Sequence, residues 1–286
     1  MRIIALALAV LALAGPAPAA ESILVGAVWL RGQGSASDLR IVDMSDESAS
    51  YRRGHIPGAV YLDVDATRVP VAGRGVRVPT AEEGARMLGA LGVTPHTRVV
   101  IYDDAGSLNA AWLFYVLETL GHRHAAVLDG GIAAWRRAGF PLAADASAIV
   151  ATSYRPAPKP ERVATAEWIR ERLQDRSVAL VDARSPGEYS GAKRYAKRGG
   201  HIPGAVNVEW QQHLRPDGTF KPIDELRALY TRAGVTPDKT VVTYCQTHHR
   251  GAHAYFVLRL LDYPRVVGYD RSWAEWGNRD ELPVAR

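Results

Sequence analysis

The sequence predicts two consecutive α/β domains, each with a mainly parallel sheet flanked by helices. One observation is the alternation of short β-branched runs with segments of helical length: residues 99–102 precede 109–121, and residues 241–244 precede 252–263. The other is that the same landmarks occur in the same order in both halves of the chain. Strands that alternate with helices are typical of a parallel sheet covered on both faces.

The internal repeat is visible in the sequence itself. The heptapeptide GHIPGAV at 54–60 recurs unchanged at 200–206, and LGVTPHTRVVIYD at 91–103 corresponds to AGVTPDKTVVTYC at 233–245. This period is far longer than the roughly 20–50 residues of solenoid repeats, so it indicates a duplicated domain. The matched positions include four tryptophans, which we expect in the two cores: Trp29, Trp135, Trp168 and Trp276.

The repeat also sets the expected domain limits. We expect the first domain over residues 21–143 and the second over residues 163–286. Residues 144–162 between them are rich in proline and small residues, which predicts an extended linker. Two pairs of residues have the capping-box spacing that starts a helix: Thr80 with Glu83, and Ser272 with Glu275.

The first 20 residues have the pattern of a secretory signal peptide. A basic residue precedes an apolar run over residues 3–14, and small residues follow. We expect cleavage after Ala19 or Ala20 and a periplasmic or secreted protein. The apolar run is shorter than the roughly 20 residues that span a bilayer, so we expect no membrane association.

Charge and cysteine content limit the classes of function. The formal net charge of +5 favours small anionic ligands. Nucleic-acid binding would require a continuous basic stripe with interleaved aromatic residues, which the sequence lacks, so we expect no nucleic-acid partner. With one cysteine in the chain there is no internal disulfide, and stability must come from ordinary hydrophobic cores.

That one cysteine, Cys245, lies directly after the strand 241–244 and before the second helix. In parallel α/β sheets, ligands bind beyond the carboxyl ends of the strands, so we expect Cys245 in that crevice. If residues 246–250 curl around the sulfur, their backbone N–H groups and the helix N-terminus favour an anion there. A thiolate in such a loop is nucleophilic, and the same donors stabilise the anion formed on it. The alternative is a buried and inert cysteine.

Several segments together resemble the two-domain rhodanese-type sulfurtransferases over essentially the whole mature chain. They are VDAR at 181–184, both GHIPGAV segments, VVTYC at 241–245 and SWAEW at 272–276. The loop Cys-Gln-Thr-His-His-Arg is similar to that of a bacterial two-domain subgroup. The resemblance implies that Cys245 carries a sulfane sulfur as a persulfide. The sulfur would come from thiosulfate or 3-mercaptopyruvate and pass to cyanide or a thiol, with no metal and no organic cofactor.

The resemblance also implies roles for other residues. Arg184 of VDAR would bind the anionic donor, and Arg198 is a weaker candidate for the same role. The persulfide loop would consist of Gln246, Thr247, His248, His249 and Arg250. Because two homologous domains in one chain already mimic a dimer, we expect a monomer.

The first domain lacks the cysteine and the two arginines to which the resemblance assigns roles. Asp103, Ser45 and Leu108 take the places of the cysteine and the two arginines when residues are counted along the repeat. We therefore expect the first domain to be inactive and to form one wall of the cleft. His55 and His201 occur in both copies, which indicates a structural role.

Three other functions are compatible with these residues. Cysteine phosphatases and arsenate reductases use the same fold, but their loop is one residue longer than the four residues between Cys245 and Arg250. A metal site is possible because Cys245, His249 and His253 are spaced by four residues and include soft sulfur and imidazole ligands. The third alternative is a non-catalytic persulfide carrier that presents its cysteine to a partner protein.

Overall fold

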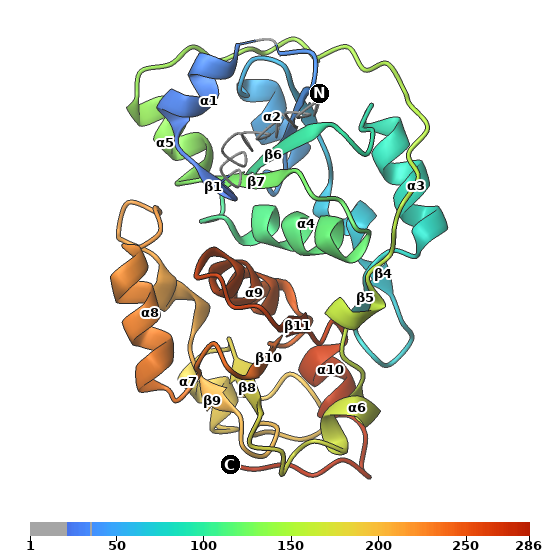
Figure 1. The fold of residues 1–286 in the computed structure, drawn as a ribbon, viewed down its shortest axis with the longest axis vertical. Coiled ribbons are helices and arrows are strands. Elements are labelled where there is room, and N and C mark those ends of the chain that lie inside the picture. The colour runs from blue at the N-terminus through green and yellow to red at the C-terminus, as the bar shows by residue number, and fades with distance from the viewer. Residues whose placement is uncertain (1–21, 35) are drawn as a thin grey trace, which may run out of the picture.

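The computed structural model describes residues 22–34 and 36–286, so the predicted signal peptide lies outside the described residues. The chain forms two α/β bodies, the first coloured blue to green and the second yellow to red in Figure 1. Each has its own parallel sheet with helices on its faces, as the sequence predicts. Among the described residues, no helix is long and apolar enough to span a membrane.

The first domain is built on a five-stranded sheet with the order β1-β7-β6-β2-β3, in which every neighbouring pair is parallel. Its strands are β1 (Leu24–Val25), β2 (Leu39–Asp43), β3 (Ala59–Tyr61), β6 (Arg98–Tyr102) and β7 (Ala125–Leu128). Its helices are α1 (Ala27–Gln33), α2 (Ser48–Arg53), η1 (Val64–Thr67), α3 (Ala81–Ala90), α4 (Leu108–Thr119) and α5 (Gly131–Arg137). A separate antiparallel hairpin consists of β4 (Val69–Pro70) and β5 (Val76–Arg77).

The second domain has a four-stranded sheet, β11-β10-β8-β9, which repeats the order β7-β6-β2-β3 with every neighbouring pair parallel, and an isolated bridge between Val163 and Gly268 takes the place of β1. Its strands are β8 (Val178–Asp182), β9 (Val206–Asn207), β10 (Thr240–Tyr244) and β11 (Val266–Gly268). Its helices are η2 (Pro160–Arg162), α6 (Ala166–Arg170), α7 (Pro186–Tyr189), η3 (Trp210–His213), α8 (Ile223–Arg232), α9 (His249–Leu260) and α10 (Ser272–Trp276). The duplication seen in the sequence is therefore a duplication of topology.

Helices α4 and α9 join the two domains. Both are buried over most of their length, although α9 also carries histidine and arginine residues. They pack against each other through Phe114 and Phe256, whose ring centroids are 5.0 Å apart, and through Tyr115 and Tyr255 at 4.9 Å. Each helix follows the central strand of its own sheet, so this contact holds the two strand-to-helix loops at one interface.

The GHIPGAV segments have the same structural role in both copies. The ring of His55 stacks on Tyr51 with centroids 3.8 Å apart, and that of His201 stacks on Tyr189 at 3.7 Å. In each pair the histidine Nδ1 is bonded to the carbonyl oxygen of its own tyrosine. The structural role predicted for the two histidines is confirmed.

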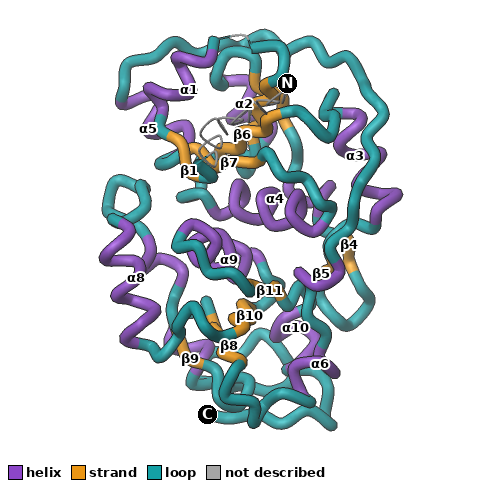
Figure 2. The backbone as a smooth tube through the Cα atoms, in the orientation of Figure 1, coloured by secondary structure: helices purple, strands orange, loops and turns teal. Residues whose placement is uncertain are grey.

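The segment 144–159 between the domains contains no helix or strand and runs along the outside of the first domain (Figure 2). It is held there by backbone hydrogen bonds from Thr152 to Gly89 and from Ala157 to Leu120. The linker is thus extended and pinned to α3 and to the end of α4.

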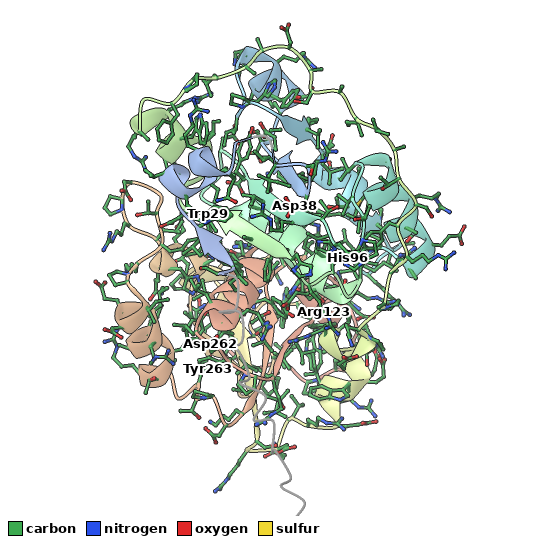
Figure 3. The ribbon with its side chains drawn as sticks, turned by 45° about the horizontal axis from the view of Figure 1, so that its top comes forward. Trp29, Asp38, His96, Arg123, Asp262 and Tyr263 are labelled. Atoms are coloured by element: carbon green, nitrogen blue, oxygen red, sulfur yellow. The ribbon has the colours of Figure 1, made fainter. Side chains whose placement is uncertain are left out.

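Two local expectations are wrong. Trp29 on α1 is 41% exposed and lies outside the core (Figure 3), whereas Trp135 and Trp276 are buried. The capping box predicted at Thr80 is present, but Ser272 makes none, because its hydroxyl donates to the carbonyl oxygen of Tyr269.

Candidate active site

Cys245 lies at the carboxyl end of β10, at the position that the sequence predicts. Its backbone N–H donates to the Ser272 hydroxyl at 3.2 Å, and its carbonyl oxygen accepts from the Trp273 N–H at 3.0 Å. Both partners belong to the first turn of α10. The backbone of the cysteine is therefore fixed from a second element, and its side chain is only 1% exposed.

The sulfur of Cys245 has an apolar side and a charged side. Ala183 and Ala254 pack against it, with Trp210 next to this cluster. Arg250, in the first turn of α9, lies on the other side. Burial alone would lower the pKa of Arg250, but hydrogen bonds to Glu188 and the charge of a Cys245 thiolate raise it. The charged form of this arginine is thus stabilised beside the sulfur.

Arg250 is oriented by a bidentate pair with Glu188. Its two terminal nitrogens donate to the carboxylate at 2.7 and 2.9 Å. Burial opposes ionisation of Glu188, but the hydrogen bonds and charge of Arg250 outweigh it and lower the pKa of the carboxyl to about 2. A capping box with Ser185 holds Glu188 at the start of α7. Two oppositely charged groups in this geometry fix each other's position near the sulfur.

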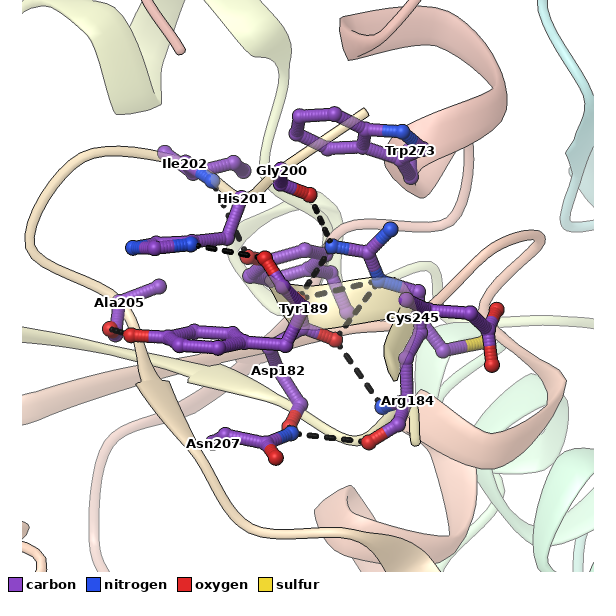
Figure 4. Close-up of polar contacts among 12 residues, drawn as sticks. Asp182, Arg184, Tyr189, Gly200, His201, Ile202, Ala205, Asn207, Cys245 and Trp273 are labelled. Atoms are coloured by element: carbon purple, nitrogen blue, oxygen red, sulfur yellow. Dashed lines mark hydrogen bonds and ion pairs between the residues drawn. The ribbon is translucent and has the colours of Figure 1, made fainter. Parts of the chain in front are cut away.

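Arg184, for which the resemblance implies donor binding, lies inside the second domain. Its side chain is 2% exposed and pairs with Asp182 at 2.6 Å, and it also donates to the Gly200 carbonyl oxygen at 2.7 Å (Figure 4). The ring of Trp273 covers the guanidinium, with the carbon of that group 4.6 Å from the ring centroid. The carboxylate two residues earlier holds this arginine inside the domain.

Arg198 is also engaged elsewhere. Its guanidinium donates to backbone carbonyl oxygens of the C-terminal segment, which are those of Trp276, Gly277, Arg279 and Leu282. These contacts consume its donors and tie the loop before GHIPGAV to the end of the chain. The donor-binding role expected of Arg198 stays a prediction.

The first two residues of the loop make side-chain contacts at its edge. The Gln246 amide nitrogen donates to the Tyr195 carbonyl oxygen at 3.1 Å. The Thr247 hydroxyl accepts from Arg68 at 2.8 Å, and Arg68 belongs to the first domain. The loop is thus supported from both domains.

The two histidines of the loop are neutral and pack against the first domain. Burial lowers the pKa of each to about 3, with a smaller contribution to His249 from the charges of Arg68 and Arg250. His248 is fully buried and its ring meets Tyr115 edge-on, with centroids 4.7 Å apart. His248 is therefore uncharged near neutral pH.

The metal site that the spacing allowed does not form. Among residues 22–34 and 36–286, no group of three or more histidine, cysteine or acidic side chains is placed to hold a metal ion. His253 lies inside α9, where its Nδ1 is 3.1 Å from the Nδ1 of His213. His253 is thus bonded to another histidine of the second domain and not to Cys245.

The first domain holds an anion of its own at the equivalent point. Asp103 follows β6, and its carboxylate accepts backbone N–H groups of Ala105 at 3.0 Å, Ser107 at 2.9 Å and Ala110 at 2.9 Å. Burial raises the pKa of Asp103 to about 6 and these N–H donors oppose the rise. A strand-to-helix loop of this fold thus provides a cradle of backbone donors for an anion.

The two loops differ in length, which changes the pairing made by counting residues. Helix α4 begins at Leu108 and α9 begins at His249, each preceded by a residue with a left-handed backbone. Leu108 is therefore equivalent to His249, and Asn109 takes the place of Arg250. The loop of the first domain is one residue longer.

The comparisons with known proteins agree with this architecture. The sequence matches the rhodanese-like domain twice, over residues 27–138 and 165–279. The chain belongs to the rhodanese family. It is a tandem rhodanese-type sulfurtransferase, as the resemblance in its motifs implied.

Three related proteins cover most of the chain. A thiosulfate sulfurtransferase from Azotobacter vinelandii is 37% identical over 89% of this chain and 94% of its own length. One from Pseudomonas aeruginosa is also 37% identical, over 87% of this chain and 92% of its own. A sulfur carrier protein, TtuD of Thermus thermophilus, is 35% identical over 92% of this chain and 96% of its own.

Solved structures of other sulfur enzymes share the fold. The wild-type structure of EanB matches with a TM-score of 0.83 and 29% identity, covering 92% of this chain and 69% of that chain. The anaerobic ergothioneine biosynthesis enzyme of Chlorobium limicola, in complex with trimethyl histidine, matches with a TM-score of 0.82 and 29% identity over 93% of this chain and 71% of that chain.

Sequence reasoning missed two charged residues of this rhodanese site. Glu188 had a usable signal, because Ser185 and Glu188 have capping-box spacing around a proline. Arg68 had none, because it comes from the other domain and its contact with Thr247 depends on how the domains pack.

Proposed function

We propose that this rhodanese transfers a sulfane sulfur from thiosulfate to a thiophilic acceptor through a persulfide on Cys245. The thiolate attacks the outer sulfur of thiosulfate, and the bond between the two thiosulfate sulfurs breaks. Its electron pair leaves with sulfite. Cyanide, or a thiol, then attacks the terminal sulfur of the persulfide, and the electron pair of that S–S bond returns to the cysteine. The two half-reactions together form a ping-pong cycle.

The observation that carries this proposal is the Asp103 loop. In the first domain, three backbone N–H groups bind a carboxylate at the end of β6. Cys245 occupies the same point at the end of β10, ahead of a helix of equal length. We infer that the N–H groups of the second loop stabilise the negative charge of the persulfide in the same way.

Arg250 would supply the second source of positive charge. It lies beside the sulfur and is held in place by Glu188. Because burial reduces screening by water, one oriented guanidinium has a larger effect on a sulfur anion here than it would on the surface. The neutral histidines would contribute packing and exclude water.

One comparison favours a second function. A relative over most of the chain is named a sulfur carrier protein. A carrier would load Cys245 from a donor and pass the sulfur only to a partner protein. The two functions share the persulfide and differ in the acceptor.

A donor panel tests the proposal. The mature chain is incubated with cyanide and with thiosulfate, 3-mercaptopyruvate or an aryl phosphate, and release of sulfite, pyruvate or phosphate is measured. We expect sulfite release and thiocyanate formation with thiosulfate, and no reaction in a Cys245→Ser variant, because a hydroxyl cannot hold a sulfane sulfur. Pyruvate release alone would make mercaptopyruvate the donor, and phosphate release would favour the phosphatase. Loading without turnover would favour the carrier.

We further propose that the protein is exported and acts as a monomer in the periplasm or outside the cell. The apolar run over residues 3–14 supports export. N-terminal sequencing of the protein from the periplasm should begin at Ala20 or Glu21. Recovery of Met1 on protein from the cytoplasm would contradict export.

A further inference from the structure

The arginines nearest the catalytic loop differ in how far their donors are used. Arg184 is paired with Asp182 inside the domain, and Arg250 makes a bidentate pair with Glu188. Arg198 is bonded to backbone carbonyl oxygens. Arg184 and Arg198 are therefore engaged away from the loop, and the charge of Arg250 beside the sulfur is balanced by Glu188.

Arg68 differs from them. It follows η1 in the first domain and crosses the domain interface to donate to the Thr247 hydroxyl at 2.8 Å, two residues after Cys245. Its side chain is 18% exposed, so it is mostly buried while keeping contact with solvent. The first domain thus places a positive charge on the catalytic loop of the second.

Most donors of Arg68 are not engaged. Its Nε is buried and has no hydrogen-bond partner. One terminal nitrogen is 3.8 Å from the carboxylate of Asp65, which is 84% exposed and beyond hydrogen-bond distance. A buried guanidinium N–H without a partner is costly, so an acceptor supplied by a ligand would remove that cost.

The aromatic surroundings of Arg68 hold it in this position. The carbon of its guanidinium is 5.8 Å from the ring centroid of Trp112 on α4, within the range of a cation–π contact. The same tryptophan meets the ring of His249 edge-on at 6.4 Å. The positive charge of Arg68 is also one cause of the lowered pKa of His249, after burial, so the two groups are close neighbours.

We propose that Arg68 is the donor-binding residue of this enzyme and that its free guanidinium N–H groups bind the sulfonate oxygens of thiosulfate. The inference rests on the proposed sulfurtransferase function and assigns to the first domain a part of the substrate site. Arginine suits this role, because its planar fork of donors matches two oxygens of one oxyanion. The first domain would then be inactive in its own loop but necessary for donor recognition.

The test separates the two half-reactions. Loading of the persulfide is measured at increasing thiosulfate, and discharge of the loaded enzyme is measured with dithiothreitol, a neutral dithiol. In Arg68→Met, which keeps an apolar stem near Trp112, we expect the apparent KM for thiosulfate to rise about ten- to one-hundred-fold, as for loss of a charged hydrogen bond. Discharge should stay within about two-fold. Arg68→Lys should recover part of the affinity, because it restores the charge.

Arg74→Met is the matched control. Arg74 also lies on the segment that reaches from the first domain to the second, where it is 3.8 Å from Glu275 and 53% exposed. The Arg74→Met variant should load from thiosulfate and discharge to dithiothreitol as the unmodified chain does. An unchanged KM in Arg68→Met, or equal slowing of loading and discharge as from a distorted loop, would overturn the inference while leaving the function intact. Failure of the unmodified chain to load from thiosulfate would overturn the function and the inference together.

Discussion

The two domains place different groups in the same strand-to-helix loop. In the first, the Asp103 carboxylate fills a cradle of three backbone N–H groups. In the second, Cys245 occupies that place, with Arg250 and Glu188 beside it. Both domains of this fold therefore provide an anion-binding loop, and the side chain at the end of the central strand determines the chemistry that the loop supports.

A second difference concerns the neighbouring strand. Asp43 at the end of β2 accepts from the Tyr102 hydroxyl and the Ser45 backbone N–H. Asp182 at the end of β8 instead pairs with Arg184. Both domains keep the buried carboxylate, and only the second neutralises it with a cation.

The two domains make matching hydrogen bonds across their interface. The Val78 N–H after the first hairpin donates to Asp270 at 3.1 Å, and the Phe220 N–H donates to Asp129 at 2.8 Å. Each domain thus extends a segment to the matching loop of the other. The asymmetry of the molecule therefore lies in a few side chains and not in its architecture.

The largest expected effect comes from exchanging the groups in the two loops. Cys245→Asp should remove sulfurtransferase turnover completely, to below about one thousandth of its rate, because a carboxylate cannot accept a sulfane sulfur. The variant should still fold, since the cradle accepts a carboxylate in the first domain. Thiocyanate formation measures activity, and circular dichroism measures folding.

The reciprocal change Asp103→Cys in the Cys245→Asp background should restore no activity. The first loop is one residue longer and has Asn109 in the place of Arg250. Turnover by this double variant would contradict the view that the second domain alone carries the site.

A smaller effect, on stability, is expected from Arg184→Met. Removing one partner of a buried ion pair leaves the Asp182 carboxylate uncompensated, which costs about 3–5 kcal/mol of the free energy of unfolding. Urea unfolding measures this loss. Adding Asp182→Asn should recover part of it. The exposed pair of Arg86 and Glu82 serves as the control, because Arg86→Met should change stability by less than about 1 kcal/mol. An Arg184→Met variant that is stable but has a raised KM for thiosulfate would show that Arg184 binds the donor.

The smallest effect is the pH dependence that Asp103 gives to stability. Its pKa of about 6 lies above the ordinary 3.8, so the folded chain holds this proton more tightly than the unfolded chain. That contribution is fully present below about pH 4 and is lost as the pH rises through 6. Over the same range the buried neutral histidines make the free energy of unfolding rise with pH, so Asp103→Asn should make that rise between pH 5 and pH 7 steeper.

Asp270 still opposes that rise in the Asp103→Asn variant, because burial raises its pKa to about 6 as well. Asp38→Asn is the control, since hydrogen bonding to Arg98 lowers the pKa of Asp38 and removes it from this pH range. An identical slope in Asp103→Asn would show that the first loop does not titrate there.

The sequence was sufficient for the fold and for the position of Cys245 at the end of the central strand. The repeated landmarks and the strand before Cys245 are local patterns, and local patterns predict topology well. Local patterns do not predict which distant residues contact a charged side chain. The ion-pair partner of Arg184, Asp182, lies two residues before it, but the Gly200 carbonyl oxygen and the Trp273 ring that enclose the pair come from later segments of the chain.

Two further differences have similar causes. The Ser272 hydroxyl binds Tyr269 and the Cys245 N–H, so a tertiary contact replaces the expected cap. The pairing of Leu108 with Arg250 counted residues along the chain, whereas the start of each helix decides which residues are equivalent.

The most direct test of the account is whether Cys245 gains a sulfur from thiosulfate without any acceptor. Intact-mass analysis of the reduced mature chain, before and after thiosulfate, should show the mass of one added sulfur atom and one equivalent of sulfite. The added mass should disappear with cyanide or a dithiol and should be absent in Cys245→Ser. Reduced protein that gains no sulfur from either thiosulfate or 3-mercaptopyruvate would contradict the proposed persulfide chemistry.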